Sequence, residues 1–313
     1  MHLLVAFASD TSEACRHVLR DLRLPHLARL LALLSPTTRD DGPANAFSPP
    51  HERALAAAWG WRGDDGLLPF AAHAAAADGI DTAEVAWGQL TPAHWQLGRD
   101  HVVMTDPSEL ALAAAESDAL FAAVRGLFES EGFAVAAGAA DRWYIGRADL
   151  GSLATASLDR VIGRSVDRWL GPAVTPIARL IRRLQSEVQL VFYTHPVNEA
   201  RELRGQLAVN SFWLSGCGRA QTAGTNADAP ELDRSLRAPL LAADWAGWAD
   251  AWRDLDAGAM ALLLARAERG DAVMLTLCGE RSTVGFALQP RPLWQRLRSR
   301  WSAAEPHALL ETL

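Results

Sequence analysis

The sequence contains no lysine, and all thirty of its basic residues are arginine. Without lysine, the chain cannot form a Schiff base with a carbonyl compound or with pyridoxal phosphate. It also lacks the lysine with which a P-loop reaches nucleotide phosphates. We therefore expect any phosphate or carboxylate held by a basic side chain to be held by arginine, in a planar and often bidentate mode.

Excess positive charge is also missing, because the formal net charge is −7. This excludes a generic nucleic-acid binder, which needs a dense excess of cations. The three cysteines, at positions 15, 217 and 278, form no CxxC pair, which favours reduced thiols in a cytosolic protein. The apolar run at 2–8 is too short for a signal peptide or a membrane span. The sequence thus predicts a soluble cytoplasmic protein.

Half of the 313 residues are apolar, enough for one large domain or two ordinary ones. Residues 2–8 read as a buried strand, followed by polar capping residues and leucines at helical spacing. This β-loop-α opening predicts an α/β fold. Residues 82–150 change to strands around one helix, so we expect a small inserted α+β domain there. The α/β core is then expected at 1–81 and 151–313.

Further elements are expected on either side of residue 200. A long helix over 173–193 should stop before Pro196, which disfavours helical geometry in the residue preceding it. A helix is expected at 245–268, strands at 272–277 and 284–288, and a basic helix at 291–301. Aspartates at 244, 250, 254 and 256 are expected on a solvated helix face, and the neighbouring tryptophans in the core.

The stretch from 195 to 218 is unusually rich in polar side chains. Its first part, HPVNEARELRG, places His195, Asn198 and Arg201 three residues apart on a short helix, along one side. Together they can contact a carboxylate or a phosphate. The second part, VNSFWLSGCG, predicts a strand that ends in a Gly-x-Gly turn, where main chain can approach a ligand. The alternative is a capped helix whose polar groups only satisfy the neighbouring loop.

These segments resemble the H-P-x-N-x-x-R-x-x-x-G and N-x-x-W-x-x-G-x-G signature of archaeal-type cofactor-independent phosphoglycerate mutases, members of the alkaline phosphatase superfamily. A bacterial offshoot, labelled phosphoglycerate-mutase-like or pathogenicity-factor regulatory, is more similar still. The resemblance implies an alkaline-phosphatase-like core, a mixed sheet flanked by helices, with a substrate-side insertion. It also implies ligand-binding roles for His195, Asn198, Arg201 and Asn210, the first three in a cleft between core and insertion.

That family uses two divalent metals held by Asp and His, and a serine that takes the phosphoryl group. Where its late ligands stand in T-G-D-H-S-T, this chain has CGERST. Glu280 can still ligate a metal, but Arg281 is always protonated and has no lone pair. Asp10 matches the family's first aspartate and is also a good helix cap. No histidine occurs between 196 and 306, where another ligand is expected.

The nucleophile is expected between 45 and 60. Ser48 lies there in Phe-Ser-Pro-Pro without the usual acidic neighbour, and His51 occupies the spacing where the serine is expected. Both are candidates. Several positions that the metal-assisted mechanism needs are therefore altered. Asp10, Glu280 and Arg281 are the remnant positions of the metal site, and no cofactor is expected.

The leading hypothesis is a phosphoglycerate-mutase-like pseudoenzyme with a degenerate metal site. It would bind a small phosphorylated or anionic metabolite, or a protein partner, in a regulatory role. The first alternative is an active mutase-type isomerase or phosphatase that uses Mn or Zn through rearranged ligands. The second is a structural interaction module.

Overall fold

The structure is a computed structural model that describes residues 1–98, 100–222, 229–289 and 305–313. The chain folds as two compact units. Unit 1 comprises Met1–Asn45, Pro49–Gly60 and the described part of Gly224–Leu313, and unit 2 comprises Ala46–Ser48 and Trp61–Ala223. No helix in the described part of the chain combines the length and the apolar character that a bilayer span requires.

Unit 1 is built on a five-stranded mixed sheet with the order β2-β11-β10-β1-β9. The central strand β1 (His2–Val5) runs parallel to β10 (Met274–Cys278) and to β9 (Glu231–Asp233). The antiparallel neighbours are β11 (Ser282–Ala287), beside β10, and β2 (Ser35–Asp41) at the edge. The predicted α/β class is confirmed, with strands where the apolar runs at 2–8, 272–277 and 284–288 indicate them.

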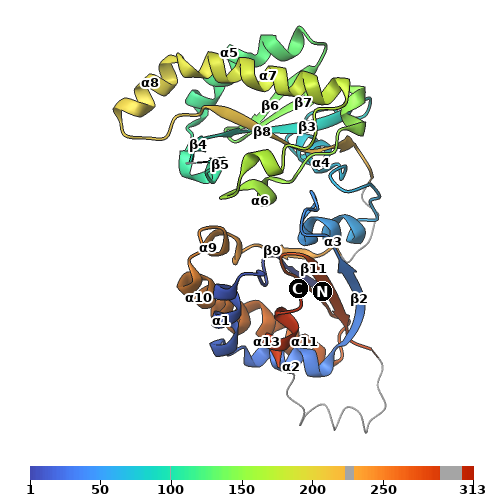
Figure 1. Cartoon of the computed structure of the whole chain (residues 1–313). Coiled ribbons are helices and arrows are strands. Elements are labelled where there is room, and N and C mark those ends of the chain that lie inside the picture. The colour runs from blue at the N-terminus through green and yellow to red at the C-terminus, as the bar shows by residue number, and fades with distance from the viewer. Residues whose placement is uncertain (99, 223–228, 290–304) are drawn as a thin grey trace. The chain divides into compact units, whose positions relative to one another are not determined.

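Helices flank this sheet (Figure 1). They include α1 (Glu13–Asp21), α2 (Pro25–Leu33), α3 (Pro50–Ala58), α9 (Arg237–Leu241), α10 (Trp245–Leu255), α11 (Ala261–Arg269) and α13 (Pro306–Leu310). Trp248 and Trp252 are fully buried in α10, with their rings edge to face at 6.2 Å. Tryptophan packing in this helix is therefore as predicted. The basic helix expected at 291–301 lies outside the described residues.

Unit 2 contains a four-stranded antiparallel sheet with the order β6-β7-β3-β8. Its strands are β3 (Ala86–Ala93), β6 (Ala134–Ala139), β7 (Arg142–Gly146) and β8 (Ser211–Arg219), and a hairpin of β4 (Trp95–Leu97) and β5 (Val102–Met104) stands beside it. Helices α5 (Ala114–Glu129), α7 (Pro176–Tyr193) and α8 (Pro196–Leu203) lie on one face (Figure 1). Helix α4 (Phe70–Ala77) lies on the other, and α6 (Leu158–Val161) is a single turn.

The boundaries of unit 2 differ from the predicted insertion at 82–150. Strand β8 pairs with β3 along Ala86–Ala93, so residues 211–219 complete the same sheet. Helix α7 packs on α5 and α4 packs on β3 and β8. Residues 61–81 and 151–222 therefore fold with 82–150 and not with the predicted core. Strand periodicity indicates that a segment is a strand but does not indicate its partner, which explains the difference.

Helix α2 in unit 1 begins at Pro25 without a capping side chain of its own. The carboxylate of Asp256 accepts hydrogen bonds from the main-chain N–H groups of His26 (3.1 Å) and Leu27 (2.8 Å) instead. The ring Nδ1 of His26 lies 3.0 Å from the same carboxylate. Asp256 opens a π-helical turn (Asp256–Met260) between α10 and α11 and is only 3% exposed. Its predicted place on a solvated face was wrong, whereas Asp250 and Asp254 are exposed.

We expect Asp256→Ala to lower the free energy of unfolding by about 1–3 kcal/mol, because the first N–H groups of α2 would lose their acceptor. Urea denaturation followed by circular dichroism measures this change. Asp254→Ala, two residues away and exposed, is the matched control and should change stability by less than about 0.5 kcal/mol. An equal loss in both variants would contradict the capping role.

Candidate functional site

Helix α8 carries the motif in which sequence analysis placed the ligand-binding residues. The preceding helix α7 ends at Tyr193, as predicted from Pro196, and His195 is the N-cap of α8. The ring Nδ1 of His195 accepts a hydrogen bond from the main-chain N–H of Val197 at 3.2 Å. His195 therefore begins the helix and satisfies one of its first donors.

The two asparagines of the motif bind main chain. Asn198 is 3% exposed, and its Nδ2 donates to the carbonyls of Phe192 (2.8 Å) and Val209 (2.7 Å). Its Oδ1 accepts from the N–H of Val209 at 2.9 Å. Asn210 makes a similar pair with Trp95, accepting from its N–H at 2.7 Å and donating to its carbonyl at 2.9 Å. These amides hold the segment before β8 in place.

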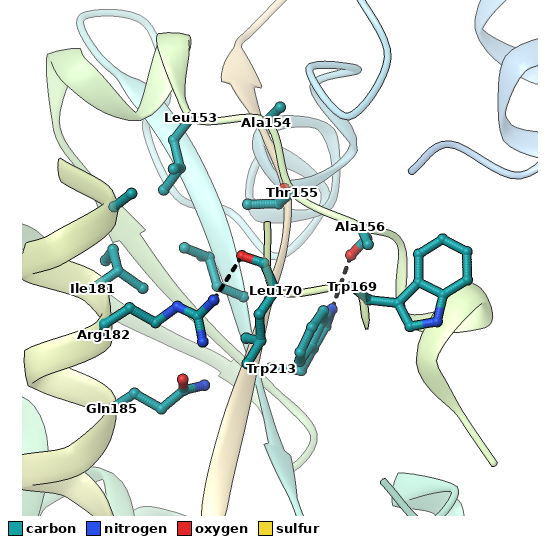
Figure 2. A pocket seen from close by; sticks show the side chains of 12 residues that line it. Leu153, Ala154, Thr155, Ala156, Trp169, Leu170, Ile181, Arg182, Gln185 and Trp213 are labelled. Atoms are coloured by element: carbon teal, nitrogen blue, oxygen red, sulfur yellow. Dashed lines mark hydrogen bonds between the residues drawn. The ribbon is translucent and has the colours of Figure 1, made fainter. Parts of the chain in front are cut away.

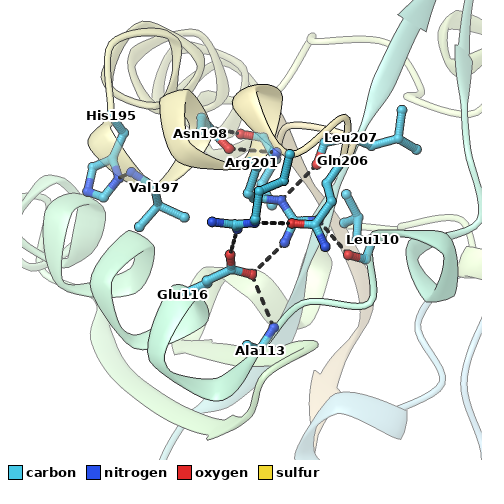
Figure 3. Close-up of polar contacts among 11 residues, drawn as sticks. Leu110, Ala113, Glu116, His195, Val197, Asn198, Arg201, Gln206 and Leu207 are labelled. Carbon is cyan, nitrogen blue, oxygen red and sulfur yellow. Dashed lines mark hydrogen bonds and ion pairs between the residues drawn. The ribbon is translucent and has the colours of Figure 1, made fainter.

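Arg201 is fully buried, and each of its nitrogens donates to the protein (Figure 3). Its Nε donates to the carbonyl of Leu207 at 2.8 Å, and its terminal nitrogens donate to the Glu116 carboxylate and the Leu110 carbonyl. Glu116 also pairs with Arg204 and accepts from the N–H of Ala113. Arg201 therefore joins α8 to α5 and to the turn before α5.

The structure brings the four predicted ligand-binding residues into one region of unit 2 but gives them other partners. Arg201 and Asn198 are buried and bonded to protein, Asn210 pairs with Trp95, and His195 caps a helix. This corrects the ligand contacts expected of Arg201 and Asn198, because no accessible donor is left for a ligand. The geometry is that of the alternative, a capped helix whose polar groups satisfy neighbouring loops.

The positions matched to metal ligands lie in unit 1, after β1 and β10. The carboxylate of Asp10 accepts from the N–H of Ser12 at 2.7 Å, and so forms the turn that leads into α1. Arg281 is exposed, and its main-chain N–H donates to the main-chain oxygen of Leu313 at 2.9 Å. Among the described residues, no group of three His, Cys, Asp or Glu side chains is arranged to hold a metal ion. Because Arg281 cannot ligate, this donor set does not fit the family's metal pair.

The two candidate nucleophiles are buried. Ser48 is 3% exposed, and its Oγ accepts from the N–H of Gly66 at 2.9 Å. His51 lies in the first turn of α3, 2% exposed, with its ring 4.9 Å from that of Phe7.

Unit 2 contains a cavity of about 40 Å³ that the sequence did not predict (Figure 2). It lies between α7, the loop that contains Thr155, the turn at 169–170 and strand β8. Its polar and aromatic walls include Thr155, Trp169, Arg182, Gln185 and Trp213. At roughly 10–15 Å³ for each water molecule, the cavity has room for about three waters or a ligand group of that size.

Arg182 is the charged group of this cavity. One terminal nitrogen donates to the carbonyls of Leu170 (3.1 Å) and Gly171 (2.9 Å). Burial lowers the pKa of its guanidinium, against the opposing effect of the Asp167 charge. Beside it, Gln185 is 6% exposed and its Nε2 donates to the carbonyl of Phe212 at 3.0 Å. The cavity therefore offers a partly desolvated cation next to an amide oxygen.

One signal in the sequence could have pointed to this cavity. Gln185 interrupts the apolar face of the helix formed by Ile181, Leu184 and Val188, and it is buried with them. A buried amide on such a face needs polar partners. The contribution of Trp169 and Thr155 depends on tertiary packing and leaves no such signal. The indole N–H of Trp169 is buried and has no hydrogen-bond partner within the described residues.

Comparison with known proteins gives structural likeness only. No protein-family model and no curated protein matches the chain. It is similar to the cofactor-independent phosphoglycerate mutase from Thermoplasma acidophilum, with 13% identity over 91% of this chain and 89% of that one and a TM-score of 0.36. It is also similar to the PH0037 protein from Pyrococcus horikoshii, with 11% identity over 92% and 87% and a TM-score of 0.45. Function depends on sites and not on folds, and so rests on this chain's own residues.

We expect Arg201→Met to lower the free energy of unfolding by about 3–5 kcal/mol, because it would leave the partly buried Glu116 without its main partner. Chemical denaturation measures the loss. Arg204→Met is the control, because that side chain is 51% exposed and pairs with the same carboxylate. It should cost about 1 kcal/mol or less. Equal losses in the two variants would contradict the architectural role of Arg201.

The same cluster predicts a pH dependence. Burial acts to raise the pKa of Glu116, but the N–H of Ala113 and the charge of Arg201 outweigh it and hold that pKa below its usual value. A depressed carboxyl pKa stabilises the fold above about pH 4.3, the unfolded value, and this contribution is lost as the pH falls through the folded value. The stability difference between the wild type and Glu116→Gln should therefore shrink between about pH 5 and about pH 3. A difference that is constant with pH would contradict the ion pair.

Proposed function

We propose that the protein binds a small anionic metabolite at the cavity beside Arg182 and does not transform it by metal-assisted phosphoryl transfer. The observation that carries this proposal is the position of the Arg182 guanidinium. It is partly buried, lines the cavity and donates hydrogen bonds to two carbonyl oxygens. Partial burial disfavours the charged form of this guanidinium, and the charge of Asp167 opposes that effect only in part. An anion in the cavity would stabilise the charged form.

The chemistry of the walls supports a carboxylate or a phosphate head group. A guanidinium presents several planar donors, which match the oxygens of either group. The amide oxygen of Gln185 can accept from a hydroxyl of the ligand. A space of about 40 Å³ takes only the head group, so the rest of a larger metabolite would lie outside it.

The resemblance to phosphoglycerate mutases makes 3-phosphoglycerate the first compound to test. In this proposal the chain keeps a mutase-like fold, and Arg281 stands where the family has a metal-binding imidazole. It then acts as a pseudoenzyme in which occupancy of the cavity has a regulatory role. The active metal-dependent enzyme is the competing function.

We expect isothermal titration calorimetry to detect binding of 3-phosphoglycerate or glycerate, and Arg182→Gln to weaken it by about 10- to 150-fold. This range corresponds to the loss of one charge-assisted hydrogen bond of about 1.5–3 kcal/mol. Arg183→Gln is the matched control, because Arg183 is the next residue of α7 but is exposed and pairs with Glu131. It should bind as the wild type does. Equal weakening in both variants, or no wild-type binding at about 10 mM, would contradict the proposal.

Metal content separates the proposed function from its competitor. We expect elemental analysis of protein purified without chelator to find less than one Mn or Zn per chain, because Arg281 repels a divalent ion. Mn²⁺ and Zn²⁺ should not raise the melting temperature. Two metal ions per chain, together with mutase activity that chelation abolishes, would establish the enzyme instead.

A further inference from the structure

Unit 2 has a second concave surface, a groove of about 410 Å³ that shares no lining residue with the cavity beside Arg182. Its walls come from the segment after Trp61, the short helical turn Ala148–Ser152 and the end of β8. Two arginines, Arg62 and Arg219, lie on it. The volume falls within the range of about 300–1,000 Å³ typical of small-molecule sites.

Arg62 is held in place by its main chain. The Oε1 of Gln221 accepts from the N–H of Arg62 at 3.0 Å, and its Nε2 donates to the carbonyl of Arg62 at 2.6 Å. The side-chain amide of Gln221 therefore satisfies both main-chain groups of Arg62 and fixes the main chain there. The Arg62 guanidinium is exposed and, within the described residues, has neither a hydrogen-bond nor an ion-pair partner.

Arg219 supplies a second cation at the end of β8. The only hydrogen bond of its side chain within the described residues is a long one of 3.5 Å, from Nη1 to the carbonyl of Glu84. Opposite stands Gly151, where a Cβ would lie 4.0 Å from the Cγ of Arg219. The charges of Arg62 and Arg219 are therefore both available to a bound anion.

Glycines keep much of the groove surface as bare main chain. A Cβ at Gly63 would lie 2.9 Å from the carbonyl oxygen of Leu67, and one at Gly218 would lie 3.1 Å from the same oxygen. The contact at Gly63 is shorter than real Cβ contacts and the contact at Gly218 is tighter than most of them, so packing favours glycine at both positions. Main chain flanked by arginines is a surface to which a phosphoryl group can approach closely.

Asp64 restricts which anion fits. Its carboxylate lies in the same groove and is exposed, so it repels a bare anion but accepts hydrogen bonds from hydroxyl groups. We infer that this groove binds the phosphate monoester of a polyhydroxylated compound, with Arg62 and Arg219 on the phosphoryl group and Asp64 on hydroxyls. This inference does not depend on Arg182 or on the proposed function.

Ribose 5-phosphate is the probe, titrated by calorimetry into the full chain, with ribose and inorganic phosphate as comparisons. We expect the ester to bind at least about tenfold more tightly than either comparison. Arg62→Gln and Arg219→Gln should each weaken it by about tenfold or more, as expected for a lost charge-assisted bond. Arg182→Gln should leave it unchanged, which separates this site from the proposed function.

Asp64→Asn gives a signature that simple charge attraction does not. It should weaken binding of ribose 5-phosphate while strengthening binding of inorganic phosphate, because the carboxylate favours hydroxyls and repels the ion. Arg23→Gln, which removes an exposed arginine of unit 1, is the control for net charge.

Three results would overturn the inference. One is ribose 5-phosphate binding no tighter than inorganic phosphate, which would make the groove an unspecific basic patch. Another is equal weakening by Arg23→Gln and Arg62→Gln. The third is no binding of the ester at about 10 mM.

Discussion

The buried guanidinium of Arg201 is the constraint on which this part of unit 2 depends. A charge without solvent must be fully paired, and removing one partner of such a pair is strongly destabilising. Arg201 meets this requirement through Glu116 on α5, the carbonyl of Leu110 before α5 and the carbonyl of Leu207 before β8. The helix that carries the family-like motif is thereby fixed to α5 and to the segment leading into the sheet. Contacts within the fold thus account for the two buried polar residues of the motif, Asn198 and Arg201.

This explains why sequence reasoning placed these residues together but did not identify the groups that they contact. The i, i+3, i+6 spacing of His195, Asn198 and Arg201 correctly indicates a helix and a shared side. It does not indicate what stands opposite that side. Glu116 is 85 residues away in sequence, and its contact with Arg201 follows from how α5 and α8 share one face of the sheet. An arginine that faces a carboxylate of its own chain has the same spacing as one that faces a ligand.

Elements determined by local pattern were predictable, and those determined by pairing were not. The strand at β1, the end of α7 before Pro196 and the buried tryptophans of α10 all follow from short-range periodicity or proline geometry. The partnership of β3 with β8 joins segments more than a hundred residues apart, and so the boundary of unit 2 could not be read from composition. Asp256 is a similar case, because its burial depends on α2 beginning beside the π-helical turn.

Because the chain has no lysine, an anion site built on a long basic side chain must use arginine. The arginines differ in how many guanidinium N–H groups remain available to a ligand. Arg201 is fully buried and every nitrogen donates to the protein. Arg182 donates through one terminal nitrogen to two carbonyls and borders a cavity. Arg62 is fixed through its main chain while its guanidinium faces a groove. A ligand can bind only the donors that folding has left available, so the number of guanidinium donors open to an anion increases from Arg201 to Arg182 to Arg62. Of these three arginines, only Arg201 lies in the motif that resembles the family.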